Sequence, residues 1–311
     1  MLLKKQHLSA ILLISITILS FFYIREYSDQ FIKITEVGAS GIAILVVLFL
    51  VSRALTVLPM IWFLSKHNAS LSILEAIKLD LSTAYLNYLP LKAGLFAKGA
   101  YLKKVHNIRY TDYVSISLSL TIIQMLTVGV LGTGISIYVN SGVFISSIFI
   151  ALSTACILVL NIPKKSLKSK FFEKNRISSL IADIVVGWQI LTSDSRFLAI
   201  VLLLVCSATL TVGLRLVLCY SFLSLETGIA EILLISLASI PVRVIGIVPG
   251  AIGIREAVIG AFDLALGGNF QTGVIAASLD RLILLGCLFV LGPLATHSLS
   301  KKMLNQPENI G

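Results

Sequence analysis

Residues 246–262 read GIVPGAIGIREAVIGAF and interrupt a chain that otherwise consists largely of apolar runs. The stretch contains one proline, four glycines and the adjacent charged residues Arg255 and Glu256. Broken backbone and charged side chains are both costly in lipid, because no water is present there to satisfy them. Such a segment is tolerated where protein or a water-filled cavity surrounds it. The stretch therefore predicts a polar site inside a membrane protein.

The composition predicts an all-α polytopic membrane protein. Of the 311 residues, 57% are hydrophobic and 13% are charged, which is unlike any ordinary globular domain. A run of about 20 apolar residues is long enough to cross a bilayer as a helix. Six full spans are predicted, at residues 8–24, 41–65, 113–139, 142–160, 197–222 and 273–297.

Two further apolar segments, residues 72–102 and 229–266, are broken by prolines, glycines and polar residues. Positive residues collect on the cytoplasmic side of membrane proteins, so their distribution indicates how these segments lie. If both are re-entrant hairpins, the predicted cytoplasmic loops carry 17 Lys and Arg residues, and the opposite loops carry only Arg25 and Lys33. We therefore predict one broken-helix hairpin inserted from the cytoplasm and one from outside, with both termini cytoplasmic.

The two hairpins share a sequence pattern that predicts an inverted repeat. Residues 88–95 (YLPLKAGL) and 247–254 (IVPGAIGI) both read apolar-apolar-Pro-x-x-x-Gly-apolar. A basic residue follows each pattern, Lys98 or Arg255, and a span with one buried arginine precedes each hairpin. These two arginines are Arg53 and Arg215. The predicted units are a first membrane half at 1–160, a basic cytoplasmic linker with an interfacial helix at 161–196, and a second membrane half at 197–311.

Proline favours the first turn of a helix, so Pro90 and Pro249 are each predicted to begin a half-helix at membrane depth. The unpaired N–H groups and partial positive charge of such an end favour an anion. Asn87 is expected either to cap the first half-helix or to contact a ligand. Glycines that permit tight turns or close backbone approach accompany both prolines, at Gly94, Gly246, Gly250 and Gly253.

Several charged residues fall inside the predicted membrane segments, where each needs a partner. Glu256 could neutralise Arg243 or Arg281, and Asp280 could neutralise Arg53 or Arg215. The surplus positive charge could meet an anionic headgroup, or the pairs could serve only to hold helices together. Asp263, near the outer end of its helix, is expected to be solvated. The basic residues in question are Arg53, Lys92, Arg215, Arg243, Arg255 and Arg281, and the acids are Asp80, Glu256, Asp263 and Asp280.

Motifs of common enzymes do not occur in the sequence. HExxH, GxSxG and GxxxxGK[ST] are all missing, so we predict no catalytic residue, no metal and no cofactor. The glycines of GVLGTG (129–134) lie inside a span, which favours close helix packing over a nucleotide loop. The net charge of +10 reflects basic loops between spans, so a nucleic-acid partner is not expected.

The stretches at 87–102 and 247–257 resemble the flippase-like integral-membrane family that includes the transmembrane region of bacterial lysylphosphatidylglycerol synthase. Family members typically show Asn-x-x-Pro-Gly-Arg-x-Gly-Glu-x-x-Arg in the first half and Pro-Gly-Gly-x-Gly-x-Arg-Glu in the second. The second motif is matched at Pro249, Gly250, Gly253, Arg255 and Glu256, with Ala251 in place of a glycine. The first is matched at Asn87, Pro90 and Gly94, with Lys92 and Lys98 at arginine positions and Leu91 and Leu95 replacing Gly and Glu.

The resemblance covers about residues 5–300 and implies lipid translocation or handling in the bacterial cytoplasmic membrane. The soluble aminoacyl-transfer domain of such synthases is not expected, because the chain stops at Gly311, so we do not predict lysyl transfer. Our leading hypothesis is a flippase or transporter of an anionic lipid: a phospholipid, an aminoacylated lipid or a polyprenyl-phosphate-linked intermediate. One alternative is an accessory that docks a glycosyltransferase or lipid-modifying enzyme through residues 161–196. The other is a headgroup transferase that uses Glu256, Asp280 or Asp80.

Overall fold

The computed structural model describes residues 32–65, 70–88, 93–161, 188–189, 194–245 and 249–305, and these residues form helices and connecting turns without any strand. Five helices in this part of the chain are long and apolar enough to cross a membrane. They confirm five of the predicted spans as helices, while the predicted span at 8–24 lies outside the described residues. The five are α3 (Ala39–Ser65), α6 (Tyr110–Tyr138), α7 (Val143–Leu160), α11 (Ser195–Phe222) and α15 (Phe270–Leu304).

The long helices expose apolar side chains on the faces that do not pack against protein, as expected in lipid. Val143 and Phe144 at the start of α7 are 88% and 77% exposed. The opposite face of α7 packs closely on α6, where a side chain on Gly132 would collide with the ring of Phe149. A Cβ on Gly129 would lie 2.8 Å from the amide nitrogen of Ser153. Gly129 and Gly132 of the GVLGTG stretch therefore lie at a helix contact, as predicted, whereas an added methyl group on Gly134 would meet nothing within 4 Å.

The segment at 72–102 forms two short helices, α4 (Ile73–Leu86) and α5 (Ala93–His106), which pack against each other. Ser72 caps α4 by accepting a hydrogen bond from the amide of Glu75. A Cβ on Gly94 would lie 2.0 Å from the carbonyl oxygen of Thr83, so only glycine permits this approach of α5 to α4. Residues 89–92, with Pro90 and Lys92, lie outside the described residues.

The segment at 229–266 is broken into α12 (Ile229–Ser239), the short α13 (Val242–Ile245), a 3-10 turn η3 (Pro249–Ala251) and α14 (Ile254–Ala265). The predicted half-helix exists, but it begins at Ile254 and not at Pro249. The reason is that Gly250 and Gly253 both take positive φ, at 63° and 77°, and so turn the chain before the helix starts.

Each short pair of helices is joined at its ends by one carboxylate. Glu75, in the first turn of α4, accepts hydrogen bonds from Tyr101 and His106 in the last two turns of α5. Lys302 of α15 adds an ion pair to the same oxygen at 2.8 Å. The start of α4, the end of α5 and the end of α15 therefore meet in one place.

Asp263 has the corresponding role at the ends of α12 and α14. It is fully buried, and the prediction that it is solvated is wrong. Its carboxylate accepts hydrogen bonds from Tyr220 of α11 at 2.9 Å and from Thr272 of α15 at 2.7 Å. Thr227, just before α12, lies 3.5 Å away. The partners come from other helices, so no local sequence signal reveals them.

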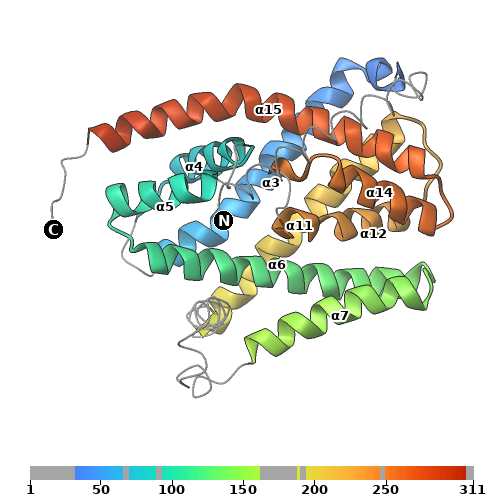
Figure 1. The fold of residues 1–311 in the computed structure, drawn as a ribbon, viewed down its shortest axis with the longest axis horizontal. Helices are drawn as coiled ribbons and strands as arrows, with labels where there is room; N and C mark the ends of the chain where they lie inside the picture. The colour runs from blue at the N-terminus through green and yellow to red at the C-terminus, as the bar shows by residue number, and fades with distance from the viewer. Residues whose placement is uncertain are drawn as a thin grey trace, which may run out of the picture.

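The two pairs of short helices lie at opposite ends of the molecule, with α15 packed against both (Figure 1). Thr272, at the start of α15, binds Asp263, and Lys302, at its end, binds Glu75. Thirty residues of helix separate these contacts, which corresponds to about 45 Å. This is about the thickness of a bilayer with its headgroup layers.

Candidate functional site

Asp280 of α15 lies at the centre of a buried charge cluster. It binds Arg215 of α11 through both carboxylate oxygens, with Nη2 of Arg215 3.2 Å from Oδ2. Arg255, in the first turn of α14, forms a second ion pair, with its Nη2 2.8 Å from Oδ2. The three side chains are at most 4% exposed. One buried carboxylate thus serves two arginines, and one positive charge remains uncompensated.

Arg255 has further unused binding capacity. Its Nε and Nη1 are buried and find no hydrogen-bond partner among the described residues. A buried guanidinium without acceptors is costly, because the donors have lost water and gained nothing. The start of α14 adds the partial positive charge of a helix N-terminus. An anion at this position would neutralise the surplus positive charge and accept hydrogen bonds from the free donors of Arg255. It would also interact favourably with the N-terminus of α14.

A second ion pair, between Glu256 and Arg281, lies next to this cluster in the sequence. Nε of Arg281 is 2.7 Å from Oε1 of Glu256, and Oε2 accepts a hydrogen bond of 2.8 Å from the amide of Gly253. Glu256 therefore caps α14 and pairs with α15 at once. Among the partners predicted from the sequence, Arg281 pairs with Glu256 and Arg215 pairs with Asp280.

Arg281 also connects the two broken segments. Its guanidinium donates hydrogen bonds to the carbonyl oxygens of Gly250 at 2.8 Å and Ala251 at 3.1 Å. It donates another, at 3.3 Å, to the hydroxyl of Tyr88, which lies at the end of α4. A Cβ on Gly250 would lie 2.3 Å from the Tyr88 ring. The loop at 249–251 in the second broken segment therefore packs against Tyr88 of the first.

The remaining predicted charges form a separate group in the first half of the chain. Arg53 of α3 pairs with Asp80 of α4 at 3.2 Å, and not with Asp280. Lys98 of α5 is half-buried. The side chain of Arg53 is 20% exposed and that of Asp80 14%. This group is therefore more accessible than the cluster around Asp280.

The other predicted residues have no established part in either group. The side-chain oxygen of Asn87 is buried and accepts no hydrogen bond from the described residues, and the amides of residues 89–92, which it was predicted to cap, lie outside them. The side chain of Arg243 lies outside what the structure describes, as do Lys92 and Gly246. Tyr88, which Arg281 contacts, was not predicted. Only its place as the first residue of the shared pattern at 88–95 could have suggested it.

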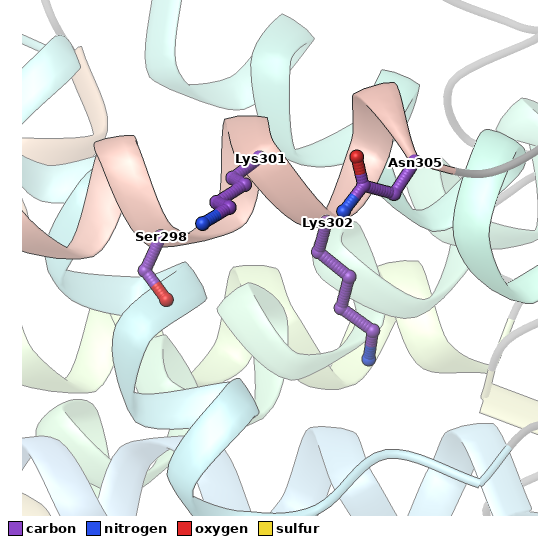
Figure 2. Close-up of a pocket in the computed structure, with 4 residues that line it drawn as sticks. All are labelled: Ser298, Lys301, Lys302 and Asn305. Atoms are coloured by element: carbon purple, nitrogen blue, oxygen red, sulfur yellow. The ribbon is translucent and has the colours of Figure 1, made fainter.

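A basic pocket lies at the other end of α15, near Glu75. One cavity, of about 360 Å³, is lined by Ser298, Lys301, Lys302 and Asn305 (Figure 2). A larger cavity of about 830 Å³ shares Lys302 with it and reaches the ends of α3, α4 and α5. Burial alone would raise the pKa of Glu75, but hydrogen bonds from Lys302, Tyr101 and His106 outweigh it and lower that pKa. The pocket therefore keeps a charged carboxylate among its lysines.

Comparison with known protein families gives a match over most of the chain. Residues 7–292 match the family described as Lysylphosphatidylglycerol synthase TM region. The chain belongs to this family. Membership in the Lysylphosphatidylglycerol synthase TM region family, with the five apolar helices, indicates a multi-pass membrane protein with a lipid-related function. Comparisons with curated proteins and with solved structures gave no match.

Proposed function

We propose that the protein is a flippase or transporter of an anionic lipid in the bacterial cytoplasmic membrane. The observation that carries this proposal is the surplus positive charge at Asp280, together with the unpartnered donors of Arg255. The phosphate of a lipid headgroup would complete the coordination of Arg255 and neutralise the surplus. Its acyl chains would remain in the bilayer.

The positions of the two carboxylates support a re-entrant arrangement of the short helix pairs. Glu75 of α4 binds the end of α5 near one end of α15. Near the other end, Asp263 of α14 binds Thr272 of α15 and lies 3.5 Å from Thr227, just before α12. A pair whose ends lie together enters and leaves on the same side. The two pairs would then insert from opposite sides of the membrane, as in inverted-repeat transporters.

Arg281 supplies the contact that a transport cycle would break. It holds the carbonyl groups of Gly250 and Ala251 and the hydroxyl of Tyr88 in one hydrogen-bond network. Rocking of the two halves would separate Tyr88 from the second segment. Arg281 would keep its ion pair with Glu256, so its charge would not be left unpaired.

The proposal is tested by lipid movement in proteoliposomes that contain fluorescent phosphatidylglycerol or a fluorescent polyprenyl phosphate. Arg255→Met should slow movement by about tenfold or more, the effect of losing one charged hydrogen bond. Arg109→Met is the matched control, because Arg109 pairs with Asp112 on an exposed surface. It should move lipid as the wild type does.

Two outcomes would reject the proposal. Equal rates for Arg255→Met and the wild type would remove Arg255 as the anion-binding residue. No movement of either lipid by the wild type would favour the accessory role, in which the chain only docks another enzyme of a lipid-linked pathway.

A further inference from the structure

The cavity of about 360 Å³ at the end of α15 is lined by one face of that helix (Figure 2). Its lining residues are Ser298, Lys301, Lys302 and Asn305. Their positions follow the i, i+3, i+4, i+7 pattern, which places side chains on the same side of a helix. Two ammonium groups, one hydroxyl and one side-chain amide are therefore presented together. The proposed function uses none of these groups.

A third lysine reaches this cavity from α4. Nζ of Lys78 donates a hydrogen bond of 3.2 Å to Oγ of Ser298. Lys78 is half-buried, and in the described part of the chain its amino group forms no ion pair. A half-buried ammonium group with a neutral partner has lost part of its hydration and has gained no counter-charge. Lysines near the ends of spans are common, but topology does not require one from another helix at this place.

The cavity has more positive than negative charge. Lys302 pairs with Glu75, with Nζ 2.8 Å from Oε1. Neither Lys78 nor Lys301 has a carboxylate partner among the residues that the structure describes. Three ammonium groups therefore meet one carboxylate, which leaves a surplus of two positive charges. His106 pairs with the same oxygen of Glu75, and its protonation would only increase the surplus.

The larger cavity, of about 830 Å³, shares Lys302 with the first and is lined in part by apolar side chains. These apolar residues are Ile61, Leu71 and Val105. The thirty residues of helix between Thr272 and Lys302 place both cavities at the depth of the headgroups and away from the bilayer centre. A ligand held by the lysines would thus have room for an apolar portion beside them.

We propose that the cavity at Lys78, Lys301 and Lys302 is a binding site for a phosphate monoester. Such a group carries a charge of about −1.5 to −2 near neutral pH and has three strong acceptor oxygens, whereas a phosphate diester carries a single negative charge. The monoester therefore matches the surplus of two charges. The apolar lining of the larger cavity and its depth favour a lipid as the source of the phosphate.

This site goes beyond the proposed function. It shares no residue with the cluster around Asp280 and Arg255. Twenty residues of helix, or about 30 Å, separate Lys301 from Arg281. A phosphate monoester could therefore bind at the end of α15 whether or not the chain moves lipid.

The site is tested by calorimetric titration of the purified full chain in neutral detergent with dihexanoyl phosphatidic acid, a monoester, or dihexanoyl phosphatidylglycerol, a diester. The titrations use Arg255→Met, because this substitution removes the anion site of the proposed function. Phosphatidic acid should bind, and phosphatidylglycerol should bind about tenfold more weakly or worse. Adding Lys78→Gln or Lys301→Gln should weaken the binding of phosphatidic acid about tenfold, the effect of losing one charged hydrogen bond.

Lys103→Gln is the matched control, since Lys103 is exposed on α5 and lines neither of these two cavities. It should bind phosphatidic acid as tightly as the Arg255→Met chain does. Gel filtration shows whether each variant is folded. Should Lys78→Gln fail to fold, Lys301→Gln still tests the site, because Lys301 is exposed. Should Arg255→Met fail to fold, Lys301→Gln is compared with the wild type.

The outcomes separate this site from the proposed function. If the wild type binds phosphatidic acid and Arg255→Met does not, this site does not exist, and the proposed function still stands. Equal affinities for the two lipids would overturn the preference for a monoester. Inorganic phosphate that binds as tightly as phosphatidic acid would overturn the lipid source. Binding that Lys301→Gln weakens, in a chain that moves no lipid in proteoliposomes, would support this site and reject the proposed function.

Discussion

Asp280 and Arg255 have opposite roles in the same buried cluster. Asp280 compensates two arginines, so the cluster depends on it structurally. Arg255 is the second of those arginines, and without it Arg215 and Asp280 form a neutral pair. An uncompensated charge in the interior lowers the stability of the fold, and such destabilising features are typical of functional sites.

Replacement of Asp280 by asparagine should therefore lower the free energy of unfolding by about 3–5 kcal/mol, because two arginines are left buried without a counter-charge. Arg255→Met should change it little, since the remaining pair is neutral. Thermal unfolding in detergent, followed by circular dichroism, measures both. If Arg255→Met is as unstable as Asp280→Asn, Arg255 is structural, and its unused donors do not mark a ligand site.

Glycine at one helix contact decides how α4 and α5 pack. Gly94→Ala should disrupt the pair, because its Cβ would lie 2.0 Å from the carbonyl oxygen of Thr83 and 2.8 Å from Oδ1 of Asn87. We expect a loss of about 1–3 kcal/mol or more in unfolding free energy. Gly134→Ala is the control, because nothing lies within 4 Å of the added methyl group. Equal stability of the two variants would mean that α5 can shift freely on α4.

The carboxylate that joins the ends of α4 and α5 predicts a response to acid. The pKa of Glu75 in the folded protein lies below its ordinary value of 4.5, so its contribution to stability is present above about pH 4.5 and is lost as the pH falls through the lowered pKa. The wild type should lose stability in this acid range, and Glu75→Gln should lose less. Glu226→Gln, at an exposed acid, should behave as the wild type. Parallel acid profiles for Glu75→Gln and the wild type would contradict this prediction.

At the scale of the whole molecule, α15 connects the two ends at which the short helix pairs are held (Figure 1). The re-entrant arrangement predicts that the loop after α5 is cytoplasmic and that the loop before α7 lies outside. The larger cavity beside Glu75 then opens on the same side as the loop after α5. The lysines at the end of α15 would also face that side.

In a cysteine-free background, Val143→Cys should react with an impermeant maleimide in intact cells, because Val143 is 88% exposed at the predicted outer end of α7. Lys104→Cys should react only after the membrane is made permeable. Reaction of Lys104→Cys but not of Val143→Cys in intact cells would exchange the two sides, as expected if the α4–α5 pair crosses the membrane completely. The hairpin arrangement would then be wrong.

The sequence alone determined the membrane class, five of the helices that the structure describes, the breaks near Gly250 and Gly253, and the charged residues that need partners. These properties depend on composition and on neighbouring residues, which act over one or two helical turns. Tertiary structure decided which polar groups meet: Arg255 with Asp280, Arg53 with Asp80, and Asp263 with Tyr220. It also placed the guanidinium groups of Arg53 and Arg215 close to the ring of Phe49. These contacts join residues from different helices, and their geometry follows from how the helices pack, which no local pattern encodes.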